Sequence, residues 1–148
     1  MIRPYSSKDK NNLTSLLKLN IPQYFDPSEA DDFVEYLDKH AHNYFVFEEQ
    51  GQIIGAGGFN YLEDQEIVRI SWDFIHPDFH GKGIGKKLTL YRIDQIKKEA
   101  RVNLIYVRTS QLAYGFYEKM GFALEKTEKD FWAKGFDLYQ MKMDISEG

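Results

Sequence analysis

The sequence predicts an α+β domain, in which a mixed, mostly antiparallel sheet of about seven strands carries helices on both faces. Two observations support this class. Apolar residues alternate with polar ones, or form short β-branched and aromatic runs, over 44–75 and 104–145, as in strands. Apolar spacing of three and four residues marks helices near the N-terminus, after residue 83 and around residue 116. No repeat or linker interrupts the chain, so one domain over 1–148 is expected.

The elements follow in order. Ile2 to Tyr5 is a short first strand, and Ser6 and Ser7 can cap a helix over about 8–20. A second helix opens at Asp26, with Pro27 near its first turn. Further strands are expected at 44–47, 53–59, 66–75, 104–107, 122–132 and 136–145, with helices over about 84–101 and 112–120. In the strand at 66–75, alternation places Ile70, Trp72 and Phe74 on one side and Ser71, Asp73 and Ile75 on the other.

Composition excludes several classes of function. The chain has no cysteine, so it has no disulfide scaffold, cysteine nucleophile or cysteine metal site, and no metal is expected. No apolar run reaches membrane-spanning length and no apolar leader stands at the N-terminus, which predicts a cytoplasmic protein without a membrane partner. The formal net charge of −4 and the lack of a basic patch with interleaved aromatics argue against a nucleic-acid or nucleotide binder that uses the basic helix.

Charge is nevertheless distributed unevenly along the chain. Residues 26–38 carry acidic side chains without any Lys or Arg, and residues 82–101 are rich in Lys and Arg. The basic segment could hold a phosphorylated ligand and the acidic one could attract a cationic amine. Two solvated helix faces of opposite sign are the simpler interpretation, and it accounts for most of these charges.

A glycine-rich turn joins the strand at 66–75 to the next helix. Gly81, Gly83 and Gly85 leave the backbone nearly bare, and the helix that follows offers N–H groups without intrahelical partners. Such amides at the positive end of a helix form an anion site, and three lysines add charge: Lys82, Lys86 and Lys87. The spacing fits neither a Walker loop nor a dinucleotide fingerprint. The alternative is a helix-start turn whose glycines only permit tight packing.

Two motifs resemble the GNAT superfamily of acyl-CoA-dependent N-acyltransferases. The family's pyrophosphate-loop signature, Gln/Arg-x-x-Gly-x-Gly/Ala, falls on His80, Gly83 and Gly85. A second family pattern, Asn-x-x-Ala-x-x-Phe-Tyr-x-Lys-x-Gly-Phe, covers 110–122 with Ser110 in place of Asn, and it matches at Ala113, Phe116, Tyr117, Lys119, Gly121 and Phe122. The order of elements is similar to the GNAT architecture along essentially the whole chain.

The resemblance implies acetyl-CoA as co-substrate. In the family, the strands that correspond to 66–75 and 104–107 splay apart after a bulge, and the pantetheine arm lies in the gap. His80 replaces the usual Gln/Arg, and its ring could hydrogen-bond a phosphate or simply pack. The cofactor-binding residues implied are Phe74, Ile75, His80, Gly81, Lys82, Gly83, Ile84, Gly85, Lys86, Ser110 and Tyr114.

Acetyl transfer from a thioester to an amine needs a donor for the departing thiolate and an acceptor for the amine proton. By resemblance Tyr117 is the general acid, although its spacing with neighbouring apolar residues also fits a core stripe. Asp73 and Glu66 are candidate bases, and backbone N–H groups near Phe74 and Ile75 would polarise the thioester carbonyl.

The amine acceptor is the less defined substrate. Tyr24 and Phe25, two aromatics in a connection, are expected to contact a primary amine that the sequence does not identify. A GNAT-fold module that binds acyl-CoA with little catalysis is the alternative function. The C-terminal hairpin, over 122–145, offers a surface for a homodimer.

Overall fold

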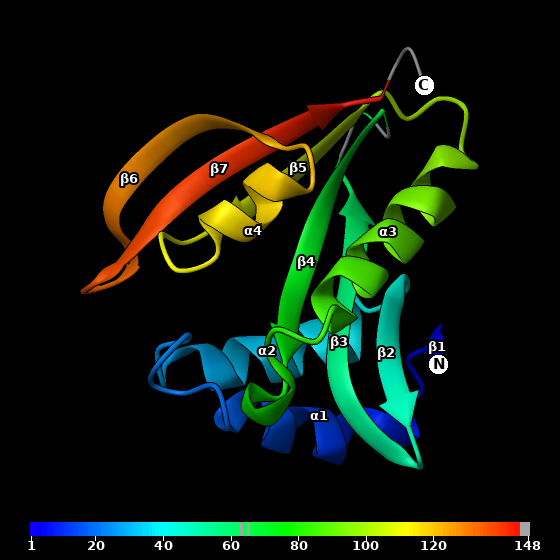
Figure 1. Cartoon of the computed structure of the whole chain (residues 1–148), viewed down its shortest axis with the longest axis vertical. Helices are drawn as coiled ribbons and strands as arrows, with labels where there is room; N and C mark the ends of the chain where they lie inside the picture. Colours follow the sequence, from blue (N-terminus) through cyan, green and yellow to red (C-terminus); the bar gives the residue numbers. More distant parts are fainter. Residues whose placement is uncertain (63, 65, 146–148) are drawn as a thin grey trace. The chain divides into compact units, whose positions relative to one another are not determined.

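The computed structural model describes residues 1–62, 64 and 66–145 of the chain. The predicted fold class is confirmed, because hydrogen bonds join the strands into a seven-stranded sheet in the order β1-β2-β3-β4-β5-β7-β6 (Figure 1). β4 and β5 are parallel, whereas β1–β2, β2–β3, β5–β7 and β6–β7 are antiparallel. The elements are β1 (Ile2–Pro4), η1 (Ser7–Asp9), α1 (Lys10–Lys18), α2 (Glu29–Lys39), β2 (Tyr44–Glu49), β3 (Gln52–Tyr61), β4 (Ile67–Ile75), η2 (Pro77–Phe79), α3 (Ile84–Lys97), β5 (Leu104–Thr109), α4 (Tyr114–Lys119), β6 (Ala123–Ala133) and β7 (Phe136–Asp144).

Contacts group the chain into two compact units. The first comprises Met1–Asn60 and Ser71–Ile93, and the second comprises Tyr61–Ile70 and Asp94–Gly148. β4 and α3 therefore each begin in one unit and end in the other. A single domain over 1–148 stays a prediction, and residues 63, 65 and 146–148 lie outside the described residues.

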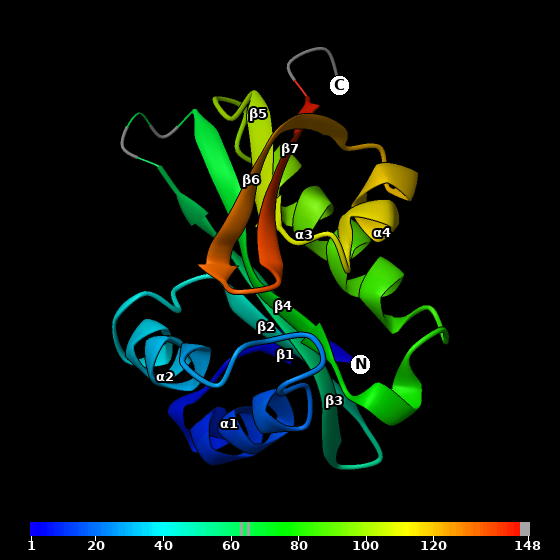
Figure 2. The same ribbon diagram turned by 90° about the vertical axis from the view of Figure 1, so that its left-hand side faces the viewer.

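Helices cover both faces of the strands in the first unit (Figures 1 and 2). On one face, α1 and α2 pack through Leu13, Leu17 and Phe33 against strand residues such as Val46 and Phe74. On the other face, α3 packs through Ile84 and Leu88 against β2 and β3, and Ile75 and Phe79 join this second cluster. These two apolar layers place the start of α3 directly beside the end of β4.

The second unit holds the parallel pair and the C-terminal hairpin. β4 pairs with β5 from Ile67 opposite Leu104 to Ile70 opposite Val107, although β5 continues to Thr109. β7 runs antiparallel beside β5 along its whole length, and β6 forms the outer strand (Figure 2). The pairing between β4 and β5 thus ends at Ile70 and Val107. The family resemblance predicts that the two strands separate beyond such a point.

Several boundaries differ from the sequence-based expectation for local reasons. The first helix begins with the 3-10 turn η1, which Ser6 caps in a reciprocal arrangement with Asp9, so the expected serine cap is present. α4 is shorter than the helix expected over 112–120, because the Ser110 carbonyl and hydroxyl accept hydrogen bonds from the next backbone amides and form a separate turn. Gly121, at φ +104°, ends α4 as expected.

Strand β4 departs from regular alternation at Trp72. This residue has φ +48°, in the left-handed region, and interrupts the pleat. The Ser71 hydroxyl lies 2.7 Å from Asn60 Oδ1, which also accepts a hydrogen bond from Tyr36 of α2, and the Trp72 ring packs against Phe33 of α2. Two consecutive side chains therefore face α2. The expectation that Ser71 shares a face with Asp73 and Ile75 is wrong, because a bulge moves every later residue to the opposite face.

A charge cluster fastens the N-terminal strand to the first turn. The carboxylate of Asp9 accepts hydrogen bonds from Arg3 at 2.8 and 2.9 Å and from the Ser6 amide at 3.0 Å. Arg3 also bonds Glu48 of β2 at 2.7 Å. The hydrogen bonds from Arg3 lower the pKa of Asp9, whose side chain is nearly buried. The cluster ties β1, η1 and β2 together.

We expect Asp9→Asn to lower the free energy of unfolding by about 1–3 kcal/mol at pH 7, because the Arg3 guanidinium loses one of its two charged partners. The folded-state pKa of Asp9 is depressed, so its contribution is complete above about pH 4 and is lost as pH falls further. Urea unfolding of both proteins between pH 7 and pH 2.5 should therefore show a stability difference that shrinks with acid.

Asp38→Asn is the matched control, because Asp38 pairs with Lys10 at 2.7 Å in an exposed position. Exposed pairs contribute about 0–1 kcal/mol, so this variant should lie close to the wild type. A constant difference for Asp9→Asn across the pH range would contradict the assigned cause.

Candidate functional site

The glycine turn between η2 and α3 has the conformation that an anion-binding loop requires. Gly81 and Gly83 have φ values of +78° and +82°, in the region that side chains rarely adopt. The backbone of Lys87 bonds the Gly83 carbonyl, so the amides of the preceding three residues lie in the first turn of α3, where a helix has no carbonyl for them. All three lysines expected to flank the loop are exposed: Lys82, Lys86 and Lys87.

Tight packing does not explain these glycines. A Cβ built on Gly81 or Gly83 would meet no described heavy atom within 4 Å. The space outside the loop is therefore open, and the glycines meet a backbone requirement together with access for a ligand. Ile84, which follows them, is buried in the apolar cluster under α3 and anchors the helix start. This combination fits the pyrophosphate of a coenzyme.

His80 is bound within the protein rather than left free at the loop. Its Nε2 lies 3.0 Å from the Ile75 carbonyl, so the ring connects the loop to the end of β4. Tyr24 approaches the same ring edge-on, with 5.2 Å between centroids. These contacts engage Nε2 and one side of the ring, and the other ring nitrogen is left for a ligand, so binding of a phosphate by His80 stays a prediction. Tyr24, expected to contact the acceptor, thus lies beside the loop expected to hold the cofactor.

Phe25 and Phe74 belong to the apolar layer under α2. Phe25 stacks on Trp72 at 6.2 Å and meets Phe74 edge-on at 6.1 Å. Phe25 is partly buried against this cluster, so its ring contributes to the core, and its predicted contact with the acceptor stays a prediction. The backbone irregularity of β4 lies at Trp72, two residues before the position expected near Phe74 and Ile75.

Asp73 forms an ion pair with a buried arginine. Nη2 of Arg92, on α3, donates to Asp73 Oδ2 at 2.8 Å, and the arginine side chain is fully buried. The same guanidinium group donates to the Gly58 carbonyl at 3.2 Å, and its Nε donates to Leu88. A Cβ on Gly57 would lie 2.5 Å from Asp73 and 2.7 Å from Arg92, so the glycine makes room for the pair.

The second unit contains the remaining cofactor candidates and the proposed acid. Tyr117 is buried, with Phe116 at 5.1 Å and Phe122 at 5.7 Å between ring centroids, as the core-stripe interpretation expects. Tyr114 of α4 packs on Tyr139 of β7, with 5.1 Å between their ring centroids. The predicted site residues thus fall into two groups: the glycine turn and its neighbours lie in the first unit, and Tyr114 and Tyr117 lie in the second.

Glu66 lies outside the strand in which it was expected. β4 begins at Ile67, and the exposed Glu66 contributes its backbone carbonyl to a 2.9 Å hydrogen bond with the Asn103 amide. The two candidate bases therefore differ: Glu66 is exposed at a strand start, and Asp73 is held by Arg92.

Acidic residues before α2 have a local structural role. Asp26 accepts hydrogen bonds from the backbone and hydroxyl of Ser28, which lower its pKa, and its own amide donates to Glu29 at 2.9 Å. Burial raises the pKa of Glu29. These bonds order the turn that leads into α2, whose N-cap residue, Ser28, makes no side-chain capping bond. Part of the acidic charge therefore serves the helix, and Asp31 and Asp32 remain exposed.

Sequence reasoning missed Arg92 and Gly57, although a signal was present. Arg92 occupies the buried stripe of α3 defined by Ile84 and Leu88 at intervals of four residues, where an apolar residue is expected. A charge at such a position indicates a buried partner.

Comparison with known proteins identifies the family. The sequence model described as "Acetyltransferase (GNAT) domain" matches residues 15–145. The chain belongs to the GNAT acetyltransferase family. Relatives include an N-acetyltransferase of Escherichia coli (strain K12), 29% identical over 66% of this chain, and one of Chlorobaculum tepidum, 31% identical over 67%. The chain spans about 60% of the length of each of these two relatives.

Solved GNAT structures share the fold. An aminoglycoside 6'-N-acetyltransferase complexed with coenzyme A has a TM-score of 0.80 at 17% identity, covering 98% of this chain and 97% of the other. A Salmonella typhimurium acetyltransferase with its cofactor acetyl-CoA has a TM-score of 0.79 at 18% identity, covering 100% and 95%. The family that the two sequence motifs indicated is thus confirmed.

No helix in residues 1–62, 64 and 66–145 is long and apolar enough to cross a membrane. In the same part of the GNAT chain, no three or more His, Cys, Asp or Glu side chains are grouped to hold a metal ion.

We expect Arg92→Met to lower the free energy of unfolding by about 3–5 kcal/mol, because it leaves the Asp73 carboxylate and the Gly58 carbonyl without this donor. Denaturant unfolding measures the effect. Arg101→Met is the control, since Arg101 is 57% exposed and its ion pair with Glu99 is long, at 3.5 Å. Equal stability of the two variants would show that the buried pair does not hold α3 to β3 and β4.

Proposed function

We propose that this GNAT protein transfers the acetyl group of acetyl-CoA to a primary amine by direct attack in a ternary complex. The observation that carries the proposal is the turn at Gly81 and Gly83, left-handed, open to solvent and placed at the start of α3. Backbone amides of Gly83, Ile84, Gly85 and Lys86 would bind the pyrophosphate, and Lys82 would add charge. Ser110 and Tyr114 would contact the rest of the coenzyme.

Tyr117 is the proposed general acid. The amine nitrogen bonds to the thioester carbon, the carbon–sulfur bond breaks, and the tyrosine hydroxyl gives its proton to the departing thiolate. A phenol has a pKa of about 10 and is protonated at neutral pH, so Tyr117 can share or donate its proton as negative charge develops on the departing thiolate. Burial of the Tyr117 ring between two aromatic rings would hold the hydroxyl in one position. Amides near Phe74 and Ile75 would stabilise the carbonyl oxygen.

The amine proton has two proposed acceptors, Asp73 and Glu66. Asp73 follows the bulge residue Trp72 but is engaged by Arg92, so accepting a proton would weaken that ion pair. Glu66 is exposed and free of this constraint. The engagement of Asp73 favours one alternative function, a module that binds acyl-CoA with little turnover. Tyr24 and Phe25 are proposed to contact the acceptor, and a homodimer through β6 and β7 stays a prediction.

Calorimetric titration with acetyl-CoA tests the proposed coenzyme site. We expect Gly83→Asp to weaken acetyl-CoA binding by about 100-fold or more, because it places a carboxylate where the pyrophosphate approaches. Gly51→Asp is a matched control, since Gly51 has φ +78° in the same unit and no described heavy atom within 4 Å of an added Cβ. If Gly51→Asp weakens acetyl-CoA binding as much as Gly83→Asp does, backbone strain rather than the ligand site explains the loss of affinity.

Release of the CoA thiol in the presence of a panel of amines tests catalysis. We expect Tyr117→Phe to lower kcat by about 100-fold or more with little change in the acetyl-CoA Kd, because only proton donation is removed. Tyr91→Phe removes a hydroxyl from another packed ring and should match the wild type. Acetyl-CoA binding without amine-dependent thiol release would instead establish the binding module.

A further inference from the structure

Two arginines occupy one face of the parallel strand pair in the second unit. Arg69 of β4 lies opposite Tyr106 of β5, and Arg108 follows two residues later on β5. Because side chains alternate along a strand, these three residues share a face. The intervening residues are buried on the other face: Val68, Ile70, Ile105 and Val107. Two guanidinium groups are therefore directed to the same side of β4 and β5.

This face is the one turned away from α4. Tyr139 of β7 packs on Tyr114 of α4, and Tyr139 pairs with Thr109 of β5. Thr109, and every second residue before it along β5, therefore faces α4. Arg108 pairs with Gln140 and faces the opposite way.

Arg108 lies against two neighbouring aromatic rings and leaves one donor unused. Its guanidinium carbon lies 4.9 Å from the centre of the Phe131 ring and 5.7 Å from that of Trp132. The buried Nε has no hydrogen-bond partner among the described residues. A buried donor without a partner is costly, and in native proteins it usually indicates a water or ligand that completes it.

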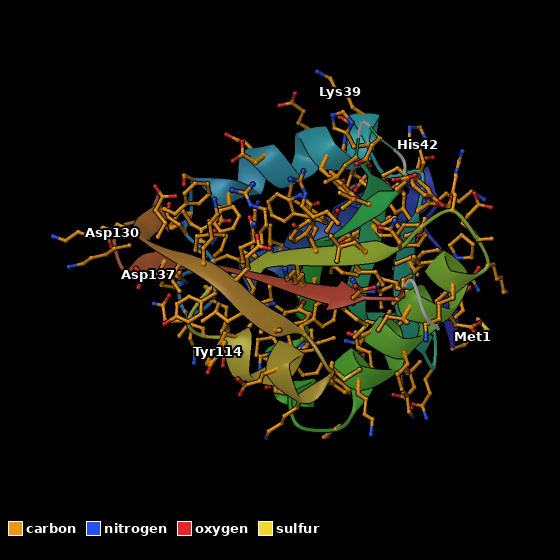
Figure 3. All side chains as sticks on the ribbon, turned by 90° about the horizontal axis from the view of Figure 1, so that it is seen from above. Met1, Lys39, His42, Tyr114, Asp130 and Asp137 are labelled. Atoms are coloured by element: carbon orange, nitrogen blue, oxygen red, sulfur yellow. The ribbon has the colours of Figure 1, made fainter. Side chains whose placement is uncertain are left out.

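The end of the β6–β7 hairpin keeps these rings in position. Trp132 Nε1 donates to the Thr109 carbonyl at 3.1 Å. Gln111 bonds the Gly135 carbonyl at 2.6 Å and the Asp137 amide at 2.9 Å, which fastens the turn to the segment after β5. Asp130 and Asp137 lie together at this end (Figure 3), and the Asp130 amide donates to Asp137 at 2.9 Å. The surroundings of Arg108 are thus organised without a ligand.

The electrostatics of this face favour an anion. Burial lowers the pKa of Arg108, and the nearby positive charge of Arg69 lowers it further. The negative charge of Glu128 raises this pKa, but not enough to cancel the other two effects. Two like charges in a partly desolvated place are stabilised by a negative group between them. A carboxylate suits an arginine edge, because its two oxygens match the parallel N–H groups of Nε and one Nη. Its single charge also suits a site that already contains Glu128.

We propose that Arg108, flanked by Phe131 and Trp132 and joined by Arg69, binds the carboxylate of the acceptor, so that the acceptor is an amino carboxylate such as an amino acid. This inference rests on the proposed acetyl transfer to an amine. It names the class of substrate and adds a binding residue outside the cofactor loop. Phe131 and Trp132 would also offer apolar surface to the acceptor beside its charge.

Paired acceptors test the proposal. Amino acids and their carboxamides, such as phenylalanine and phenylalaninamide, are compared by kcat/KM from thiol release. We expect the wild type to prefer the acid by about tenfold or more and Arg108→Gln to lose most of this preference, because the amide cannot replace the charged partner. Arg101→Gln removes an exposed arginine of the same unit and should keep the wild-type ratio.

A binding measurement separates this inference from the proposed activity. The N–H resonances of arginine Nε and of the Trp132 indole are followed by NMR during titration with N-acetylphenylalanine and, separately, its amide. The Nε–H resonance that is missing from the spectrum of Arg108→Lys belongs to Arg108. N-acetylphenylalanine should shift this resonance, and its amide should not. Arg108→Lys keeps the positive charge but lacks the paired N–H groups of a guanidinium, so its preference for the acid should be intermediate. This variant keeps the test valid if Arg108→Gln folds poorly.

Each outcome decides one of the two ideas. A shift with the acid, but no turnover of any amine, would support the carboxylate site and overturn the proposed activity. Turnover with an acid-to-amide ratio that Arg108→Gln leaves unchanged would overturn the site and keep the activity. A shift caused by coenzyme A rather than by the acid, with weaker acetyl-CoA binding by Arg108→Gln, would assign the arginine to a coenzyme phosphate and overturn the proposal.

Discussion

The buried ion pair between Arg92 and Asp73 is the interaction on which the candidate cofactor site depends. It joins the middle of α3 to β4, and the bond from Arg92 to the Gly58 carbonyl extends the connection to β3. Gly57 permits this close approach because a side chain there would occupy the space of the pair. An anion-binding helix start has to be rigid to keep its amides aligned, and here one guanidinium holds the helix against two strands.

The same pair constrains the chemistry. A carboxylate in β4 would be the natural acceptor for the amine proton, yet the carboxylate nearest the bulge is already bound by an arginine. The fold therefore uses Asp73 to position α3, and a proton acceptor must either work against this ion pair or lie elsewhere. Family membership specifies the fold, whereas the side chains particular to this chain decide what its site accepts.

Arg108 illustrates how such a side chain differs from a structural one. Arg92 is fully buried, and each of its donor atoms has a hydrogen-bond acceptor in the protein. Arg108 is partly buried, packed by rings and left with an unused donor beside another positive charge. The hydrogen bonds of Arg92 are complete without a ligand, whereas those of Arg108 are not. For that reason we assign Arg92 to stability and Arg108 to binding.

The sequence by itself determined the features that depend on neighbours along the chain. The order of helices and strands, the serine cap at η1, the glycine turn before α3 and the glycine that ends α4 all follow from local spacing and backbone preference. Only the tertiary structure decided which face Asp73 takes, that His80 bonds the Ile75 carbonyl, and what surrounds Arg108. A single left-handed residue at Trp72 reverses the alternation, and the partners of Asp73 and Arg108 stand 19 or more residues away. Local periodicity carries no information about contacts of that kind.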